Sequence, residues 1–152
     1  METVLLEILG TQDRCGMAKD LLALLAGTTE RRGDFRDALA TLIGSKLVSM
    51  GTGARVRITP EGRTAVEGAA SKTIFERLAI LRSGREPYDE RVIACLSAAG
   101  HVPLQFAEIR ERTGLGPRIL KTALQRLRRD GWIVERRGAF MTSPALARLI
   151  GR

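Results

Sequence analysis

The sequence predicts a mainly α protein with small β-hairpins, of the α+β class, built as two similar domains in tandem joined by a helical linker. Apolar residues recur at helical spacing along most of the 152 residues. Each half also contains two short strand-like segments around a glycine-containing turn. The order helix, helix, helix, hairpin, helix occurs twice, which places the domains at residues 1–70 and 87–152 and the linker at 71–86.

Three helices are expected in the first half, over residues 4–9, 18–25 and 34–43, because their apolar residues repeat at three- and four-residue intervals. Gly27 ends the second helix, and Asp34 is the expected N-cap of the third. The apolar stripe of this third helix comprises Phe35, Ala38, Leu39, Leu42 and Ile43.

A hairpin is expected next, with strands at 46–50 and 55–59 around a turn at 51–53. Thr59 then caps a helix that has Pro60 in its first position and runs toward Ala69.

The second half repeats this order, with helices expected over 88–99, 106–113 and 117–129. The core side of the last of these helices comprises Ile119, Leu120, Ala123, Leu124 and Leu127. A hairpin with strands at 132–135 and 139–142 follows, and Ser143 caps a final helix that ends at Ile150.

The two halves align at the level of whole domains. Leu39 and Leu42 correspond to Leu124 and Leu127 at an offset of 85, while Thr59-Pro60 corresponds to Ser143-Pro144 at an offset of 84. The second hairpin is therefore one residue shorter than the first.

The linker is also helical in pattern, because Ile74, Phe75, Leu78, Ala79 and Leu81 give residues 71–84 an apolar face. Two interpretations remain open. The helix packs against one or both domains, burying Ile74, Phe75 and Leu78, or it forms a homodimer through the same stripe.

Composition and charge limit the possible functions. The net charge is +8, and residues 76–152 contribute +7 of it, which favours a polyanionic partner. No apolar run is long enough to cross a membrane, and no secretory signal is recognisable, so a soluble, cytoplasmic protein is expected. Cys15 and Cys95 are expected to be reduced thiols, because two cysteines make neither a disulfide framework nor a metal cluster.

No catalytic or cofactor-binding constellation can be assembled. His101 is the single histidine, and it lies in a loop between helices, where a surface role is expected. The chain has no Cys-x-x-Cys and no Gly-x-x-x-x-Gly-Lys loop, and Gly51-Thr52-Gly53 joins two strands rather than a strand to a helix. We therefore expect a protein that is not an enzyme and uses no cofactor or metal.

Each half resembles a winged helix-turn-helix domain of the kind common in bacterial transcription regulators. The segments 47–63 and 127–134 carry this resemblance, because both look like the end of a recognition helix running into a wing. The resemblance implies that the third helix of a domain enters the major groove of double-stranded DNA and that the hairpin lies along the backbone. It specifies the fold more closely than the biological role.

In the second domain, polar residues lie opposite the apolar stripe of the third helix, and the wing adds two arginines at its turn. The expected DNA-binding residues there are Arg118, Lys121, Thr122, Gln125, Arg128, Arg129, Arg136 and Arg137. Arg, Lys, Gln and Thr can all reach base edges or phosphates. The competing interpretation is an ordinary solvated helix face; it is disfavoured because no acid interrupts residues 118–129.

The first domain carries a weaker signal. Its third helix exposes Arg36 but also Asp37, which would repel a phosphate, while Arg55 and Arg57 lie on its wing. Weak DNA contact through the wing and a role as a protein-interaction or dimerisation platform both stay open.

The leading functional expectation is a sequence-specific DNA-binding regulator of bacterial or phage type, associated with the nucleoid. The alternative is a chromosome-architecture or protein-interaction subunit, because tandem winged helices also resemble the small accessory subunits of bacterial condensin complexes. A third interpretation, an enzyme fragment or nuclease accessory domain, is disfavoured by the missing acidic cluster.

Overall fold

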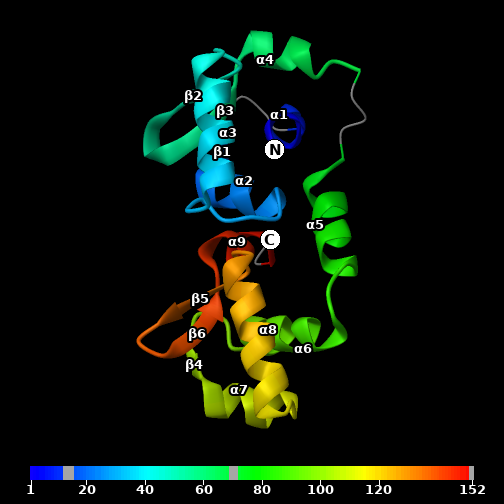
Figure 1. The fold of residues 1–152 in the computed structure, drawn as a ribbon, viewed down its shortest axis with the longest axis vertical. Helices are drawn as coiled ribbons and strands as arrows, with labels where there is room; N and C mark the ends of the chain where they lie inside the picture. The colour runs from blue at the N-terminus through cyan, green and yellow to red at the C-terminus, as the bar shows by residue number, and fades with distance from the viewer. Residues whose placement is uncertain (12–15, 69–71, 151–152) are drawn as a thin grey trace. The chain divides into compact units, whose positions relative to one another are not determined.

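A computed structural model describes residues 1–11, 16–68 and 72–150 of the chain. The chain divides into two compact units, Met1–Leu81 and Arg82–Arg152. Both units are mainly helical, and each contains one small three-stranded antiparallel sheet (Figure 1). The α+β class expected from the sequence is therefore confirmed.

The first unit follows the expected order of elements. Its helices and strands are α1 (Glu2–Gly10), β1 (Met17–Ala18), α2 (Lys19–Leu25), α3 (Gly33–Gly44), β2 (Val48–Met50), the 3-10 turn η1 (Thr52–Ala54), β3 (Arg55–Ile58) and α4 (Pro60–Ala65). Helix α5 (Ile74–Ser83) follows, and the boundary between the units falls within it.

The second unit repeats the order of the first. Its elements are α6 (Pro87–Ala98), β4 (Leu104–Gln105), α7 (Phe106–Thr113), α8 (Pro117–Arg129), β5 (Ile133–Arg136), β6 (Ala139–Thr142) and α9 (Pro144–Ile150).

Each sheet has a third strand that the sequence analysis did not predict. β1 pairs with β3, and β4 pairs with β6, so the strand orders are β1-β3-β2 and β4-β6-β5. These added strands are two residues long, which is too short to show an alternating pattern. They attach the segment before the second helix of each unit to the hairpin.

The correspondence between the halves extends to single backbone hydrogen bonds. The Leu47 amide donates to the Leu42 carbonyl at 3.0 Å, and the Trp132 amide donates to the Leu127 carbonyl at 2.9 Å. The Thr59 amide in turn donates to Leu47, and the Ser143 amide donates to Trp132. The end of the third helix is thus tied to the hairpin in the same way in both units.

Several local predictions are confirmed. The Gly62 amide donates to Thr59 Oγ1 at 3.1 Å, and the Leu146 amide donates to Ser143 Oγ at 3.2 Å, so both residues act as side-chain caps. Gly114 adopts a φ of 66° at the end of α7, in the left-handed region that glycine tolerates best.

Other predictions are wrong in detail. Arg32, not Asp34, is the N-cap of α3, and the Asp34 carboxylate accepts from the amide of Phe35. Ile43 and Ile119, expected on core faces, are 38% and 48% exposed because they lie at the edges of their apolar stripes. Helix α4 ends at Ala65, well before Ala69, which lies outside the described residues.

The linker helix is shorter than expected. It begins after Thr73, which forms a reciprocal cap with Glu76: the Thr73 amide donates to Glu76 Oε2, and the Glu76 amide donates to Thr73 Oγ1. Ile74 and Leu78 are half-buried rather than fully buried. Ser71 and the side chain of Phe75 lie outside the described part of the structure.

None of the helices in the described ranges is both long and apolar enough to span a lipid bilayer.

Candidate nucleic-acid interface

Helix α8 carries the largest set of residues expected to bind DNA. Pro117 occupies its first turn, where the missing amide hydrogen costs nothing. One side of the helix is buried by Leu120, Ala123, Leu124 and Leu127. The helix contains five basic residues and no acidic residue, so its solvent side is strongly positive.

The structure places all the expected α8 residues on that solvent side. Arg118, Lys121, Thr122, Gln125, Arg128 and Arg129 are each exposed. The Thr122 hydroxyl donates to the Arg118 carbonyl at 3.1 Å, one turn earlier. We call these six residues the α8 face.

Arg126 belongs to the same helix but does not belong to the α8 face. Its Nη2 donates to Asp89 Oδ1 at 2.9 Å, and its Nε lies 2.8 Å from Asp89 Oδ2. The guanidinium also lies 5.4 Å from the centre of the Tyr88 ring. Asp89 is only 1% exposed, so this hydrogen-bonded ion pair links α6 to α8 and turns the Arg126 side chain toward the core side.

The pKa of Arg126 is consistent with a structural ion pair between α6 and α8. The hydrogen bond to Asp89, followed by the one to Tyr88, raises the pKa of the Arg126 guanidinium above its usual value. Sequence reasoning gave Arg126 no role, because nothing in the local spacing shows that a buried carboxylate on another helix faces it.

Two residues of the α8 face are paired with acids from neighbouring segments. Arg128 Nη1 donates to Glu135 Oε2 on β5, and Arg129 Nε lies 3.1 Å from Asp130 Oδ1. Helix α8 itself has no acid, as expected, but the turn and strand that follow bring two carboxylates to its edge. Arg128 and Arg129 thus each have a carboxylate beside them, whereas Arg118 and Lys121 form no ion pair with any residue that the structure describes.

The tip of the second hairpin presents Arg136 and Arg137 to solvent. Arg137 has a φ of 52° and Gly138 a φ of 78°, as in the tight turns that suit the twist of a two-residue hairpin. Strand pairing of Arg136 with Ala139 closes the turn. Both guanidinium groups thus project from a short, well-defined loop.

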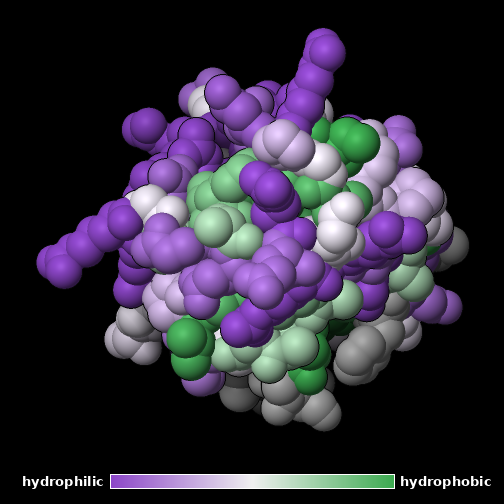
Figure 2. All heavy atoms as spheres, turned by 90° about the horizontal axis from the view of Figure 1, so that it is seen from below, coloured by the Kyte–Doolittle hydropathy of each residue, from purple (hydrophilic) through white to green (hydrophobic). Residues whose placement is uncertain are grey.

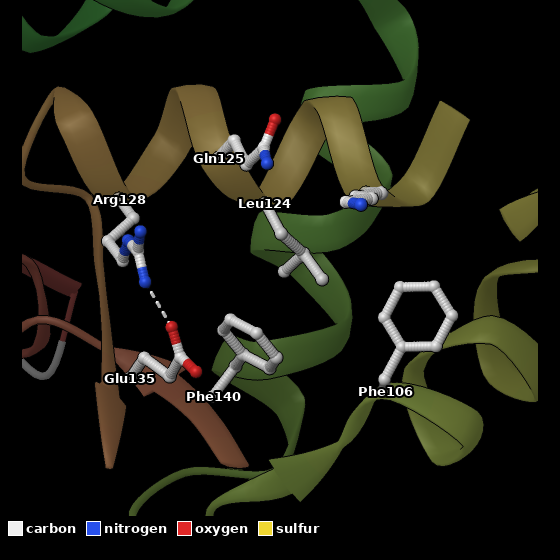
Figure 3. A pocket seen from close by; sticks show the side chains of 7 residues that line it. Phe106, Leu124, Gln125, Arg128, Glu135 and Phe140 are labelled. Atoms are coloured by element: carbon white, nitrogen blue, oxygen red, sulfur yellow. Dashed lines mark hydrogen bonds and ion pairs between the residues drawn. The ribbon is translucent and has the colours of Figure 1, made fainter. Parts of the chain in front are cut away.

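A hollow of about 170 Å³ lies between α8 and this hairpin. Phe106 at the start of α7, Leu124 and Phe140 supply its apolar side chains, and Figure 3 shows the Arg128–Glu135 pair beside them. Lys121 and Gln125 also line it. Seen from the end of Figure 1 where α7 lies, the surface is mostly hydrophilic, with apolar side chains between the hydrophilic ones (Figure 2).

A buried arginine anchors the turn between α8 and β5. The Arg85 guanidinium lies 4.2 Å from the centre of the fully buried Trp132 ring and 3.5 Å from the Asp130 carboxylate. Burial lowers the pKa of Arg85, while the Asp130 charge opposes this shift. Asp130 therefore connects the base of the hairpin to the chain just before α6.

The first unit presents fewer cations on its third helix. Arg36 and Asp37 are both exposed on α3, so opposite charges lie side by side there. On the hairpin, Arg55 Nη2 donates to the Gly16 carbonyl at 2.7 Å, while the side chain of Arg57 lies against Gly16 and Gly51. All three predicted arginines are exposed, but the mixed charge of α3 does not match the α8 face.

Metal-ligating side chains do not gather in groups of three or more within the described ranges. Cys95 is half-buried, and burial raises the pKa of its thiol. Cys15 lies outside the described residues.

Comparison with protein-family models, with curated proteins and with solved structures yields no match to this chain.

Proposed function

We propose that the chain is a double-stranded-DNA-binding protein made of two winged-helix domains, in which the second unit binds DNA through α8 and the β5–β6 wing. It acts as a sequence-specific regulator, without catalytic activity and without a cofactor. The observation that carries this proposal is the α8 face: six exposed polar residues, four of them cationic, on a helix without a single acid.

Both the charge and the shape of α8 favour binding to double-stranded DNA. A helix of this width fits the major groove, and cations on its outer side replace counterions condensed on the phosphates. The wing then adds two arginines at a tight turn, where a backbone or minor-groove contact would be made.

Within the α8 face, Arg118, Lys121 and Gln125 occur at intervals of three and four residues, which gives them a common side. We assign base reading to Arg118 and Gln125, because Arg can pair with guanine and Gln with adenine in a bidentate manner. We assign phosphate contacts to Arg136 and Arg137, because their position at a turn does not align them along a row of base edges as a helix face does.

A salt titration tests this assignment in the full-length protein. Binding is measured to a random duplex and to a duplex selected from a random pool by the protein. R118A and Q125A are each expected to cost about 1–3 kcal/mol on the selected duplex and little on the random one. R136A and R137A are expected to weaken both duplexes equally and to reduce the salt slope by about one phosphate.

R91A provides the matched control, because Arg91 is an exposed arginine on α6, outside the α8 face and the wing. R91A removes the same charge as the arginine variants above. It is expected to change neither the preference for the selected duplex nor the salt slope of binding appreciably. If R118A and Q125A weaken both duplexes equally, the protein binds charge or shape, and the chromosome-architecture alternative replaces the regulator. If the wild-type protein binds no duplex at low salt, the DNA-binding proposal itself fails.

A further inference from the structure

Glu135 is the single acidic residue of the β5–β6 hairpin, whose residues 133–142 include two arginines. It lies on β5, two residues before the turn at Arg137-Gly138. Its carboxylate accepts a hydrogen bond from Nη1 of Arg128 on α8. An acid thus stands where α8 and the wing meet, on the surface that we propose binds a polyanion. A surface selected only for phosphate affinity would not place an acid there.

The ion pair is accessible to solvent. The Arg128 side chain is 55% exposed and the Glu135 side chain 32% exposed. Exposed pairs of this kind contribute little to folding stability. The wing is held independently by the β5–β6 ladder and by the hydrogen bond from the Trp132 amide to the Leu127 carbonyl. Glu135 is therefore not required to keep the hairpin in place.

The pair instead changes what Arg128 can offer to DNA. A phosphate that approaches Arg128 must compete with a carboxylate already bound to it and is repelled by the same negative charge. Phe140, the cross-strand partner of Glu135, and Leu124 line the hollow beside the pair (Figure 3).

We propose that Glu135 is a specificity-determining residue: it holds Arg128 away from phosphates and thereby lowers the affinity of the α8 face for DNA that is bound through phosphate contacts alone. Base contacts of Arg118 and Gln125 then account for a larger share of the binding energy. This inference rests on the proposed function. It concerns selectivity, because non-specific binding rests almost entirely on phosphate contacts whereas base contacts also hold a specific complex in place, so the loss of one phosphate contact weakens non-specific binding more.

E135Q in the full-length protein tests the inference directly, since it removes the charge and keeps the shape. We expect its affinity for a random duplex to rise about three- to tenfold at low salt and its salt slope to steepen by about 0.9, the value of one further phosphate. Affinity for the selected duplex rises less, so the ratio of the two affinities falls.

E86Q is the matched control, because Glu86 is an exposed acid of the same unit, at the N-terminus of α6 rather than at the wing. It changes the net charge by the same amount and is expected to leave the slope unchanged. E135T, with a residue that suits a strand, repeats the test should E135Q not fold.

A double-mutant cycle identifies Arg128 as the residue that Glu135 restrains. The affinity gain that E135Q gives in the wild-type background is expected to be absent when E135Q is introduced into R128A, whatever the affinity of R128A itself.

The two proposals fail in different ways. If E135Q and E135T bind like the wild type, or bind the random duplex more weakly, this inference is overturned while DNA binding stands. If E135Q still raises the affinity for the random duplex in the R128A background, the inference is also overturned. A wild-type protein that binds neither duplex overturns the proposed function instead.

Discussion

The arginines of helix α8 differ in what their guanidinium groups contact. Arg118, Arg126 and Arg129 all belong to α8, but only Arg126 meets a buried carboxylate. The exposed positions could be predicted from helical periodicity, because they lie opposite the apolar stripe. The partners of Arg126 and Arg128 could not, because Asp89 and Glu135 lie on other segments and become neighbours only on folding.

The contrast between Arg126 and Arg118 yields a prediction at this scale. R126A leaves the Asp89 carboxylate, which is 1% exposed, without its cation. We expect a loss of about 3 kcal/mol in the free energy of unfolding, measured by urea titration of the fluorescence of Trp132. R118A removes an exposed side chain and is expected to change that free energy by less than about 0.5 kcal/mol.

For DNA binding, the expected order of the two variants R118A and R126A is the opposite of their order for stability. R118A reduces preference for the selected duplex, while R126A, assayed at a temperature where it stays folded, retains it. Equal unfolding free energies for the two variants would show that the Arg126–Asp89 pair is not the structural link between α6 and α8 that its geometry indicates.

At the scale of elements, several helix ends could be predicted from the sequence, although the N-cap of α3 and the end of α4 could not. The caps Thr59 and Ser143, the prolines at positions 60, 117 and 144, and the stop at Gly114 were all predicted from local chemistry. The edge strands β1 and β4 were not predicted, since two residues contain no period. Their pairing with β3 and β6 depends on chain segments that are far apart in sequence.

Gly62 illustrates how one residue sets the packing of an element. It is buried in α4, and a Cβ placed there would lie 2.1 Å from the Leu47 carbonyl oxygen and 2.8 Å from Ile58 Cγ1. The absence of a side chain therefore lets α4 lie against the start of the first hairpin. The corresponding position of the second unit is Leu146, which is buried without needing this close approach.

G62A is accordingly expected to destabilise the protein by about 3 kcal/mol, because the obstacle is backbone rather than a flexible side chain. G33A is the control: Gly33 begins α3, nothing lies within 4 Å of its would-be Cβ, and the change is expected to be neutral or stabilising by about 0.5 kcal/mol. Thermal unfolding followed by circular dichroism compares them. A G62A melting temperature equal to that of wild type would contradict the close packing of α4 on Leu47.

At the scale of the whole molecule, the tandem repeat was visible in the sequence because both the apolar pattern and the capping residues recur at nearly constant offset. The packing of the segment around residue 85 onto the second unit could not be predicted from the sequence. The Arg85 contact with Trp132 and Asp130 ties residues that the sequence analysis assigned to the linker to the second unit. A lone arginine before a proline-initiated helix gives no local sign of a buried aromatic partner.

This contact predicts how far the second unit can be truncated at its N-terminus without losing stability. A fragment of residues 82–152 retains Arg85 over Trp132, whereas a fragment of residues 87–152 leaves that ring face and Asp130 uncovered. We expect the longer fragment to be more stable by about 1–2 kcal/mol in urea titrations followed by Trp132 fluorescence. R85A in the longer fragment is expected to reproduce most of the difference, and equal stability of the two fragments would count against the assigned contact.

The distribution of charge between the units predicts how DNA binding divides between them. Residues 82–152 carry 14 basic and 7 acidic side chains, whereas residues 1–81 carry 11 and 10. Because counterion release depends on the cations placed against phosphates, the 82–152 fragment is expected to retain most of the salt slope of the full chain. The 1–81 fragment, whose α3 exposes Asp37 next to Arg36 in the sequence, is expected to bind at least about tenfold more weakly at low salt. Fluorescence anisotropy with one random duplex compares the two fragments, after circular dichroism has shown that each is folded. Equal affinities would mean that the α8 face is not the principal binding surface, and Arg55 and Arg57 on β3 would then be the next residues to replace.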